Sequence, residues 1–232
     1  MRKLNAPGDS VQDVFSTCIE SYRDAALKNR LRSIVPVLSD EASRFEDCVL
    51  TSKTHTIPTA DNVGGVVSKA EMLDIYESKF VKGTGRPYYD KYMSLPTNGK
   101  CPFCGIGTVS TLDHYLPKSK YPALAITPKN MIPACRDCNL GKKRTFSPQN
   151  SEEEPLHPYF DDVEQDIWLS VRFEVAGKEL VPTYFVRKPV AWNDLLFRRV
   201  ENHMVLYNLY TSYAVYASPS EITAAGRAAL AK

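Results

Sequence analysis

The sequence predicts a mixed α+β protein in which a small strand–strand–helix module is flanked by a helical region and by a hairpin-plus-helix region. Three observations support this fold class. Apolar residues recur at helical spacing before residue 98, two CxxC pairs enclose short apolar segments further on, and an alternating pattern near the C-terminus indicates a β-hairpin. We therefore expect three parts, residues 1–98, 99–150 and 151–232.

The composition is that of an ordinary globular protein. The 232 residues include 29 Lys and Arg against 27 Asp and Glu, with 43% hydrophobic and 24% charged residues. These values exclude a disordered, collagen-like or coiled-coil chain, and a net charge of +2 argues against a nucleic-acid coat that works by bulk positive charge. We find no apolar run long enough to span a membrane and no signal peptide. We therefore expect a cytoplasmic chain with reduced thiols.

The N-terminal region is expected to contain four helices. One amphipathic helix is predicted over residues 10–31 with Ser10 as its N-cap, and a second over residues 39–50. Residues 51–65 resemble a loop. A capping box over residues 68–71 predicts a third helix that runs to about residue 82, and a short fourth helix follows. Two cysteines, Cys18 and Cys48, lie in these helices, and we interpret them as small core residues.

The C-terminal region is expected to begin with a hairpin. Residues 167–175 and 180–187 alternate apolar and polar side chains. Pro189 can open a long helix after it, and a last short helix is expected after Ser220.

Four of the six cysteines fall into two CxxC pairs. Cys101 and Cys104 form the first, Cys135 and Cys138 form the second, and thirty residues separate the pairs. Two such turns that face each other present four thiolates with the tetrahedral geometry of a structural zinc site. Because four thiolates leave no open position for water, we expect Zn²⁺ here to stabilise the fold and not to catalyse a reaction. Unrelated buried pairs and a redox CxxC are the alternatives.

The segment between the pairs contains a second set of polar residues. A short strand precedes Asp113 and His114, Asn130 opens a second strand, and the second CxxC begins a helix that carries Asn139. The order is therefore strand, loop, strand and helix. The residues "LDHYLPKSKYP", then "NMIPACRDCN" and "KK", resemble the HNH endonuclease motif of the ββα-metal nucleases, here with a four-Cys zinc frame.

The resemblance covers residues 100–144 and implies a role for each polar residue. His114 would be the general base, and Asn130 would orient the loop backbone that polarises it. Asn139 occupies the third position, where the family nominally has His. The implied products are a 5′-phosphate and a 3′-hydroxyl. The chemistry agrees, because a neutral imidazole can accept a proton near neutral pH.

Asp113 and Asn139 are the candidate ligands of a catalytic divalent metal. Their side-chain oxygens are hard donors that suit Mg²⁺ or Mn²⁺. Consecutive strand residues point to opposite faces. Asp113 and His114 should therefore reach one reaction centre only if the strand bends.

The net charge of +2 conceals a local basic bias. Residues 100–149 hold eight Lys and Arg against two Asp, a net of +6, and the rest of the chain has a net of −4. Basic side chains around a phosphodiester site would neutralise phosphates without reading sequence. Tyr115 and Tyr121 could stack on a base or pack in the core. The candidate nucleic-acid contacts are Lys118, Lys120, Lys129, Lys142, Lys143 and Arg144.

The main hypothesis is a metal-dependent HNH endonuclease that cuts DNA. The start "MRKL" and the placement of the module resemble, more weakly, the HNH effectors of Septu-like or retron-associated anti-phage systems, and this resemblance implies an ATPase partner. A non-catalytic zinc-stabilised adaptor that binds nucleic acid and an RNase of the same mechanism are the alternatives. We interpret His55 and His203 as structural, and His157 as a residue that packs against or caps the module or contributes to the site.

Overall fold

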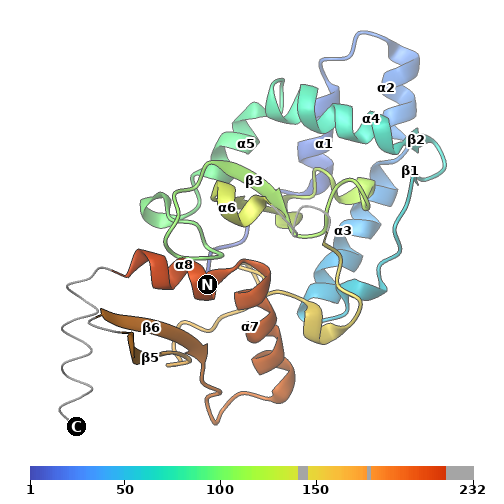
Figure 1. Ribbon diagram of the computed structural model, residues 1–232. Coiled ribbons are helices and arrows are strands. Elements are labelled where there is room, and N and C mark those ends of the chain that lie inside the picture. The colour runs from blue at the N-terminus through green and yellow to red at the C-terminus, as the bar shows by residue number, and fades with distance from the viewer. Residues whose placement is uncertain (141–145, 177–178, 218–232) are drawn as a thin grey trace.

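The computed structural model describes residues 1–140, 146–176 and 179–217. Helices form most of the N-terminal region, and the C-terminal region combines a hairpin with two helices (Figure 1). The described residues form three two-stranded antiparallel sheets. The α+β class is therefore confirmed. The main helices are α1 (Val11–Ile19), α2 (Ala25–Arg32), α3 (Val35–Leu50), α4 (Lys69–Asp74), α5 (Arg86–Met93), α6 (Arg136–Asn139), α7 (Asp194–Leu206) and α8 (Leu209–Tyr216). The strands are β1 (Asn62–Val63), β2 (Val67–Ser68), β3 (Thr111–His114), β4 (Met131–Ala134), β5 (Leu169–Ala176) and β6 (Glu179–Val186).

The prediction of a single helix over residues 10–31 is wrong, because the structure has two helices there, α1 and α2. Ser10 caps α1 by accepting the N–H of Asp13, as expected. The chain then turns, and the carboxylate of Asp24 accepts the N–H groups of Ala26 and Leu27. This second N-cap starts α2, since a capping side chain satisfies N–H groups that have no partner within a helix.

The other helices also differ from their predicted limits. Helix α3 starts at Val35 with Pro36 in its first turn, before the predicted residue 39. The capping box of Ser68 and Glu71 is present, and α4 continues as a π-helical segment, η2 (Ile75–Val81). Helix α7 begins at Asp194, because the side chain of Asn193 accepts the N–H of Leu196, and not at Pro189. Helix α8 was not predicted, and the helix expected after Ser220 lies outside the described residues.

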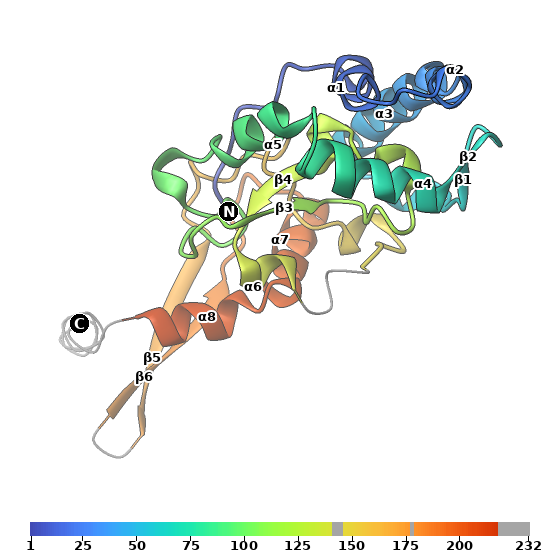
Figure 2. The same cartoon turned by 90° about the horizontal axis from the view of Figure 1, so that it is seen from above.

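The predicted hairpin is confirmed as β5–β6, in the register Leu169↔Val186 to Ala176↔Glu179. It extends from the body of the molecule beside α8 (Figure 2). No helix among the described residues has the length and apolar character needed to cross a bilayer.

The β3–β4 pair separates two hydrophobic clusters. In its register His114 pairs with Met131 and Asp113 with Ile132. Met131 belongs to a cluster formed mainly by the N-terminal helices, whereas Ile132 belongs to a cluster that contains the four cysteines and the C-terminal region. Because side chains alternate along a strand, the two faces of β3–β4 pack against different parts of the chain.

Candidate active site and metal centre

A cleft of about 830 Å³ lies where the strand–strand–helix segment meets the N-terminal helices. All four residues of β3 line it, together with Asn139 of α6. The opposite wall is formed by residues of α4, η2 and α5. Three of the four polar residues predicted to act together, Asp113, His114 and Asn139, therefore line one cleft. The cleft is lined by Leu73, Tyr76, Glu77, Val81, Tyr89, Thr111, Leu112, Asp113, His114, Pro117, Lys118, Ser119, Asn139 and Leu140.

His114 is the last residue of β3, and its side chain is held on two sides. Its Nε2 lies 2.8 Å from the carbonyl oxygen of Ala125. A carbonyl only accepts, so Nε2 carries a proton, and in the neutral imidazole Nδ1 is the nitrogen that can accept one. The ring of Tyr76 meets the imidazole edge-on at a centroid distance of 4.8 Å. These contacts fix both the tautomer and the orientation of His114.

Asn130 is buried behind the cleft and does not line it. Its Oδ1 accepts the N–H of Leu116 at 2.8 Å. Its Nδ2 donates to the carbonyl oxygens of Leu116 and Leu124, each at 3.0 Å. Leu124 directly precedes Ala125, whose carbonyl contacts His114. Asn130 thus forms hydrogen bonds with both ends of the loop, Leu116 and Leu124, that supports the imidazole.

Asp113 and Asn139 approach the cleft from β3 and α6. Oδ1 of Asp113 accepts the backbone N–H of His114 at 2.8 Å, and Nδ2 of Asn139 donates to the hydroxyl of Thr111 at 3.1 Å. Among the described residues β4 is the sole partner of β3, and every residue of β3 lines the cleft. The cleft therefore runs along the strand and reaches two consecutive residues. A carboxylate and an amide oxygen are donors that fit Mg²⁺ or Mn²⁺.

The sequence analysis missed the opposite wall. Tyr76 and Glu77 belong to η2, and Tyr89 belongs to α5. Burial raises the pKa of Tyr76, so its hydroxyl stays neutral. The capping box locates the helix that leads to η2, but nothing in the sequence shows which part of the module it contacts.

The four CxxC cysteines form a buried cluster. Their sulfur atoms lie within 4.8 Å of one another, and Sγ of Cys104 is 3.8 Å from Sγ of Cys135. Tetrahedral Zn–S bonds of about 2.3 Å place sulfur atoms about 3.8 Å apart, so these residues could bind zinc. The N–H of Gly107 donates to Sγ of Cys104, and the neighbouring Cys101 thiol lowers the pKa of Cys104. A Cβ on Gly107 would lie 2.7 Å from Sγ of Cys135, so this position requires glycine.

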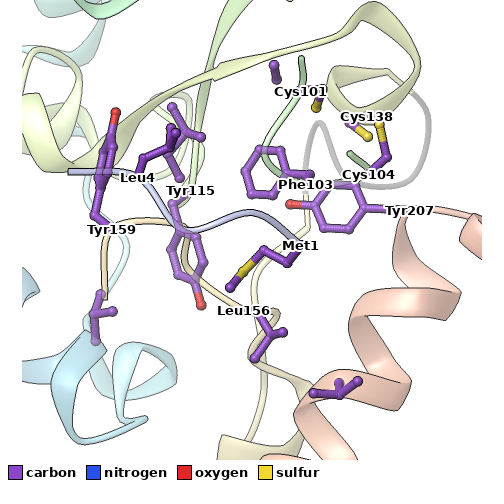
Figure 3. Close-up of a cluster of buried hydrophobic side chains, with 14 of the residues drawn as sticks. Met1, Leu4, Cys101, Phe103, Cys104, Tyr115, Cys138, Leu156, Tyr159 and Tyr207 are labelled. Atoms are coloured by element: carbon purple, nitrogen blue, oxygen red, sulfur yellow. The ribbon is translucent and has the colours of Figure 1, made fainter. Parts of the chain in front are cut away.

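The C-terminal helices support the first CxxC turn (Figure 3). The ring of Tyr207 stacks on Phe103 at a centroid distance of 4.6 Å, and His203 donates from Nε2 to the carbonyl of Phe103 at 2.9 Å. The hydroxyl of Tyr213 donates to the carbonyl of Cys104 at 2.9 Å. The cysteine cluster is therefore part of the core between the module and the C-terminal region.

The predicted basic contacts are distributed unevenly. Lys118 lies at the cleft, and Lys120 lies outside its lining. Lys129 forms an ion pair with Glu46 of α3, also outside the cleft lining. The remaining three, Lys142, Lys143 and Arg144, lie outside the described residues.

The other histidines and tyrosines considered from the sequence pack in the interior, except His55, which is half-buried. His157 is buried among aromatic rings, with Tyr115 at 4.5 Å between centroids. His55 bonds to the buried carboxylate of Glu154 at 3.0 Å. Tyr115 and Tyr121 are buried, which agrees with core packing.

Comparisons with known proteins find two relatives. The chain is 28% identical to protein ea31 of Escherichia phage lambda over 231 residues, which cover 94% of this chain and 76% of that protein. It is 31% identical to the Septu protein PtuB of Bacillus thuringiensis over 102 residues, which cover 41% of this chain and 38% of that protein. No family model matches the sequence. No solved structure matches it.

Proposed function

We propose that this chain is a metal-dependent endonuclease of the HNH type that hydrolyses phosphodiester bonds in DNA. One observation carries the proposal: Asp113, His114 and Asn139 line a single cleft although 24 residues separate the last two. The resemblance to the HNH motif assigns a role to each of them.

In this mechanism His114 is the general base. Nδ1 accepts a proton from the attacking water, because Nε2 already carries the proton that it donates to Ala125. The carbonyl dipole of Ala125 then faces the positive imidazolium and stabilises it. Asn130 is a positioning residue, since its hydrogen bonds hold the loop that carries this carbonyl.

Asp113 and Asn139 would hold the catalytic metal through side-chain oxygens. When bound there, Mg²⁺ or Mn²⁺ supplies positive charge that stabilises the phosphate and the leaving oxygen. Asp113 and Asn139 would hold that charge in the same cleft as His114. The cysteine cluster contributes no step, because four thiolate ligands complete a tetrahedral zinc site.

We further propose that the nuclease is an anti-phage defence effector that acts with an ATPase partner. The similarity to Septu PtuB supports a role in defence. The match covers 38% of PtuB, so the ATPase partner is inferred from the resemblance alone.

The test is a cleavage assay on supercoiled plasmid and on a structured RNA. Wild-type protein and His114→Ala are compared with Mg²⁺, with Mn²⁺ and without added divalent metal. We omit strong chelators, since they would also remove zinc. Metal-dependent cutting of DNA that His114→Ala loses is the expected result. Cutting of RNA alone would favour an RNase, and binding without cutting under every metal would favour the adaptor.

A further inference from the structure

An ion pair connects the two walls of the cleft. Nζ of Lys118, from the loop after β3, lies 2.5 Å from Oε1 of Glu77 in η2. The same Nζ lies 3.8 Å from the ring centroid of Tyr76, and this ring makes the T-shaped contact with His114. One aromatic ring therefore separates the lysine cation from the proposed general base.

The two residues that contact Nζ of Lys118 differ in their exposure to solvent. Tyr76 is buried, whereas the side chain of Glu77 is 55% exposed. Tyr76 and Glu77 are consecutive residues of the π-helical η2, and both line the cleft. π-Helical segments are frequent at functional sites. The ring holds the cation from the inside, and the carboxylate holds it from the solvent side, where a substrate would arrive.

A second ion pair provides a natural comparison. Nζ of Lys129 also lies 2.5 Å from a carboxylate oxygen of an N-terminal helix, Oε2 of Glu46. The two lysine side chains have nearly equal exposure, 25% for Lys118 and 27% for Lys129. The second pair does not line the cleft.

We propose that Glu77 occupies the place of a nucleic-acid phosphate on Lys118, and that Lys118 exchanges the carboxylate for a backbone phosphate when substrate enters. The inference rests on the proposed function, because it takes nucleic acid as the ligand. Carboxylates and phosphates both accept charge-assisted hydrogen bonds from an ammonium group. An exposed ion pair contributes little stability, so the exchange costs little.

Two consequences follow for binding. The Tyr76 ring keeps Nζ of Lys118 in place in both states through its cation–π contact. Glu77 competes with the phosphate and repels it after release, so wild-type protein binds nucleic acid less tightly than its positive groups allow. Glu77 therefore lowers the affinity of the cleft for nucleic acid.

The experiment measures equilibrium binding of a fluorescein-labelled DNA duplex by anisotropy at several salt concentrations, in a His114→Gln background that prevents cleavage. Glu77→Gln should bind about threefold to tenfold more tightly, with a steeper salt dependence by about one unit of slope. The matched control Glu46→Gln should change affinity by less than about twofold. In a Lys118→Ala background the gain from Glu77→Gln should disappear.

Three results would overturn the exchange. They are equal affinities for Glu77→Gln and Glu46→Gln, a gain that persists without Lys118, and failure of every variant to bind DNA. Glu77 is exposed, and Gln preserves its size, so a thermal melt suffices to verify folding. The proposed function fails separately, if wild-type protein cuts no nucleic acid with Mg²⁺ or Mn²⁺, and that result would leave the binding comparison intact.

Discussion

The cysteine cluster and the cleft share one strand–strand–helix segment but are built in different ways. All four cysteines come from 38 consecutive residues and are buried in the core. The cleft combines β3 and α6 with a wall from η2 and α5. A buried four-thiol cluster mainly determines whether the segment folds. In the proposed function, the open cleft between two regions of the chain determines what the folded segment binds and cleaves.

The two faces of β3–β4 pack against different parts of the chain. Met131 packs with the N-terminal helices, and Ile132 packs with the cysteine cluster. Asp113 pairs with Ile132 and still lines the cleft, so the division lies between the cysteines and the cleft lining and not between the two strand faces. A change of a cluster cysteine should act first on stability, and a change of a polar cleft residue should act first on activity. The following predictions test that separation.

The largest expected effect is on the cluster side. Cys135→Ser should lose bound zinc and lower the free energy of unfolding by about 4 kcal/mol or more, because structural zinc contributes directly to folding. Metal analysis and denaturant unfolding measure both quantities. Cys48→Ser is the control, since Cys48 lies outside the cluster. Full zinc content and unchanged stability in Cys135→Ser would contradict the structural role.

Asn130 is expected to affect stability and activity together. Asn130→Ala removes three buried hydrogen bonds and should lower the free energy of unfolding by about 2–4 kcal/mol. The cleavage rate should also fall, because the Ala125 carbonyl is no longer fixed. Asn139→Ala, in the cleft, should reduce cleavage and cost less than about 1 kcal/mol of stability. An equal loss of stability in both variants would contradict the distinction between Asn130, which supports the fold, and Asn139, which lines the cleft.

The smallest effect concerns the aromatic contact with His114. Tyr76→Leu should lower the cleavage rate about tenfold, because the imidazole loses its edge contact and its fixed orientation. Tyr76→Phe keeps the ring, so its rate should stay within about twofold of wild type. Equal rates for Leu and Phe would show that the ring does not position His114.

The sequence predicts the local parts of this architecture well. The CxxC spacing predicts the cysteine cluster, and alternation predicts the β5–β6 hairpin. Both depend on residues close together in the chain. The missed break before α2 has a local signal in Asp24, an N-cap residue within an apolar periodic pattern. Asn193 is the same kind of signal for the start of α7.

The cleft wall that the sequence analysis did not predict has no signal in the local sequence. Tyr76 and Glu77 are an ordinary core aromatic and an ordinary surface acid in the sequence. Their position opposite His114 depends on how the N-terminal helices dock on β3–β4, which is a tertiary contact between segments more than 30 residues apart. The division into residues 1–98, 99–150 and 151–232 and the role of each polar site residue remain predictions.

The central claim is that the cleft performs chemistry and the cysteine cluster maintains the fold. The most direct test measures zinc content, melting temperature and Mg²⁺- or Mn²⁺-dependent DNA cleavage on the same preparations of wild type and His114→Ala. We predict equal zinc, closely similar melting temperatures and a cleavage rate that falls by about 10²-fold or more, the contribution expected of a general base. An unchanged cleavage rate in His114→Ala, at full zinc content, would contradict the account.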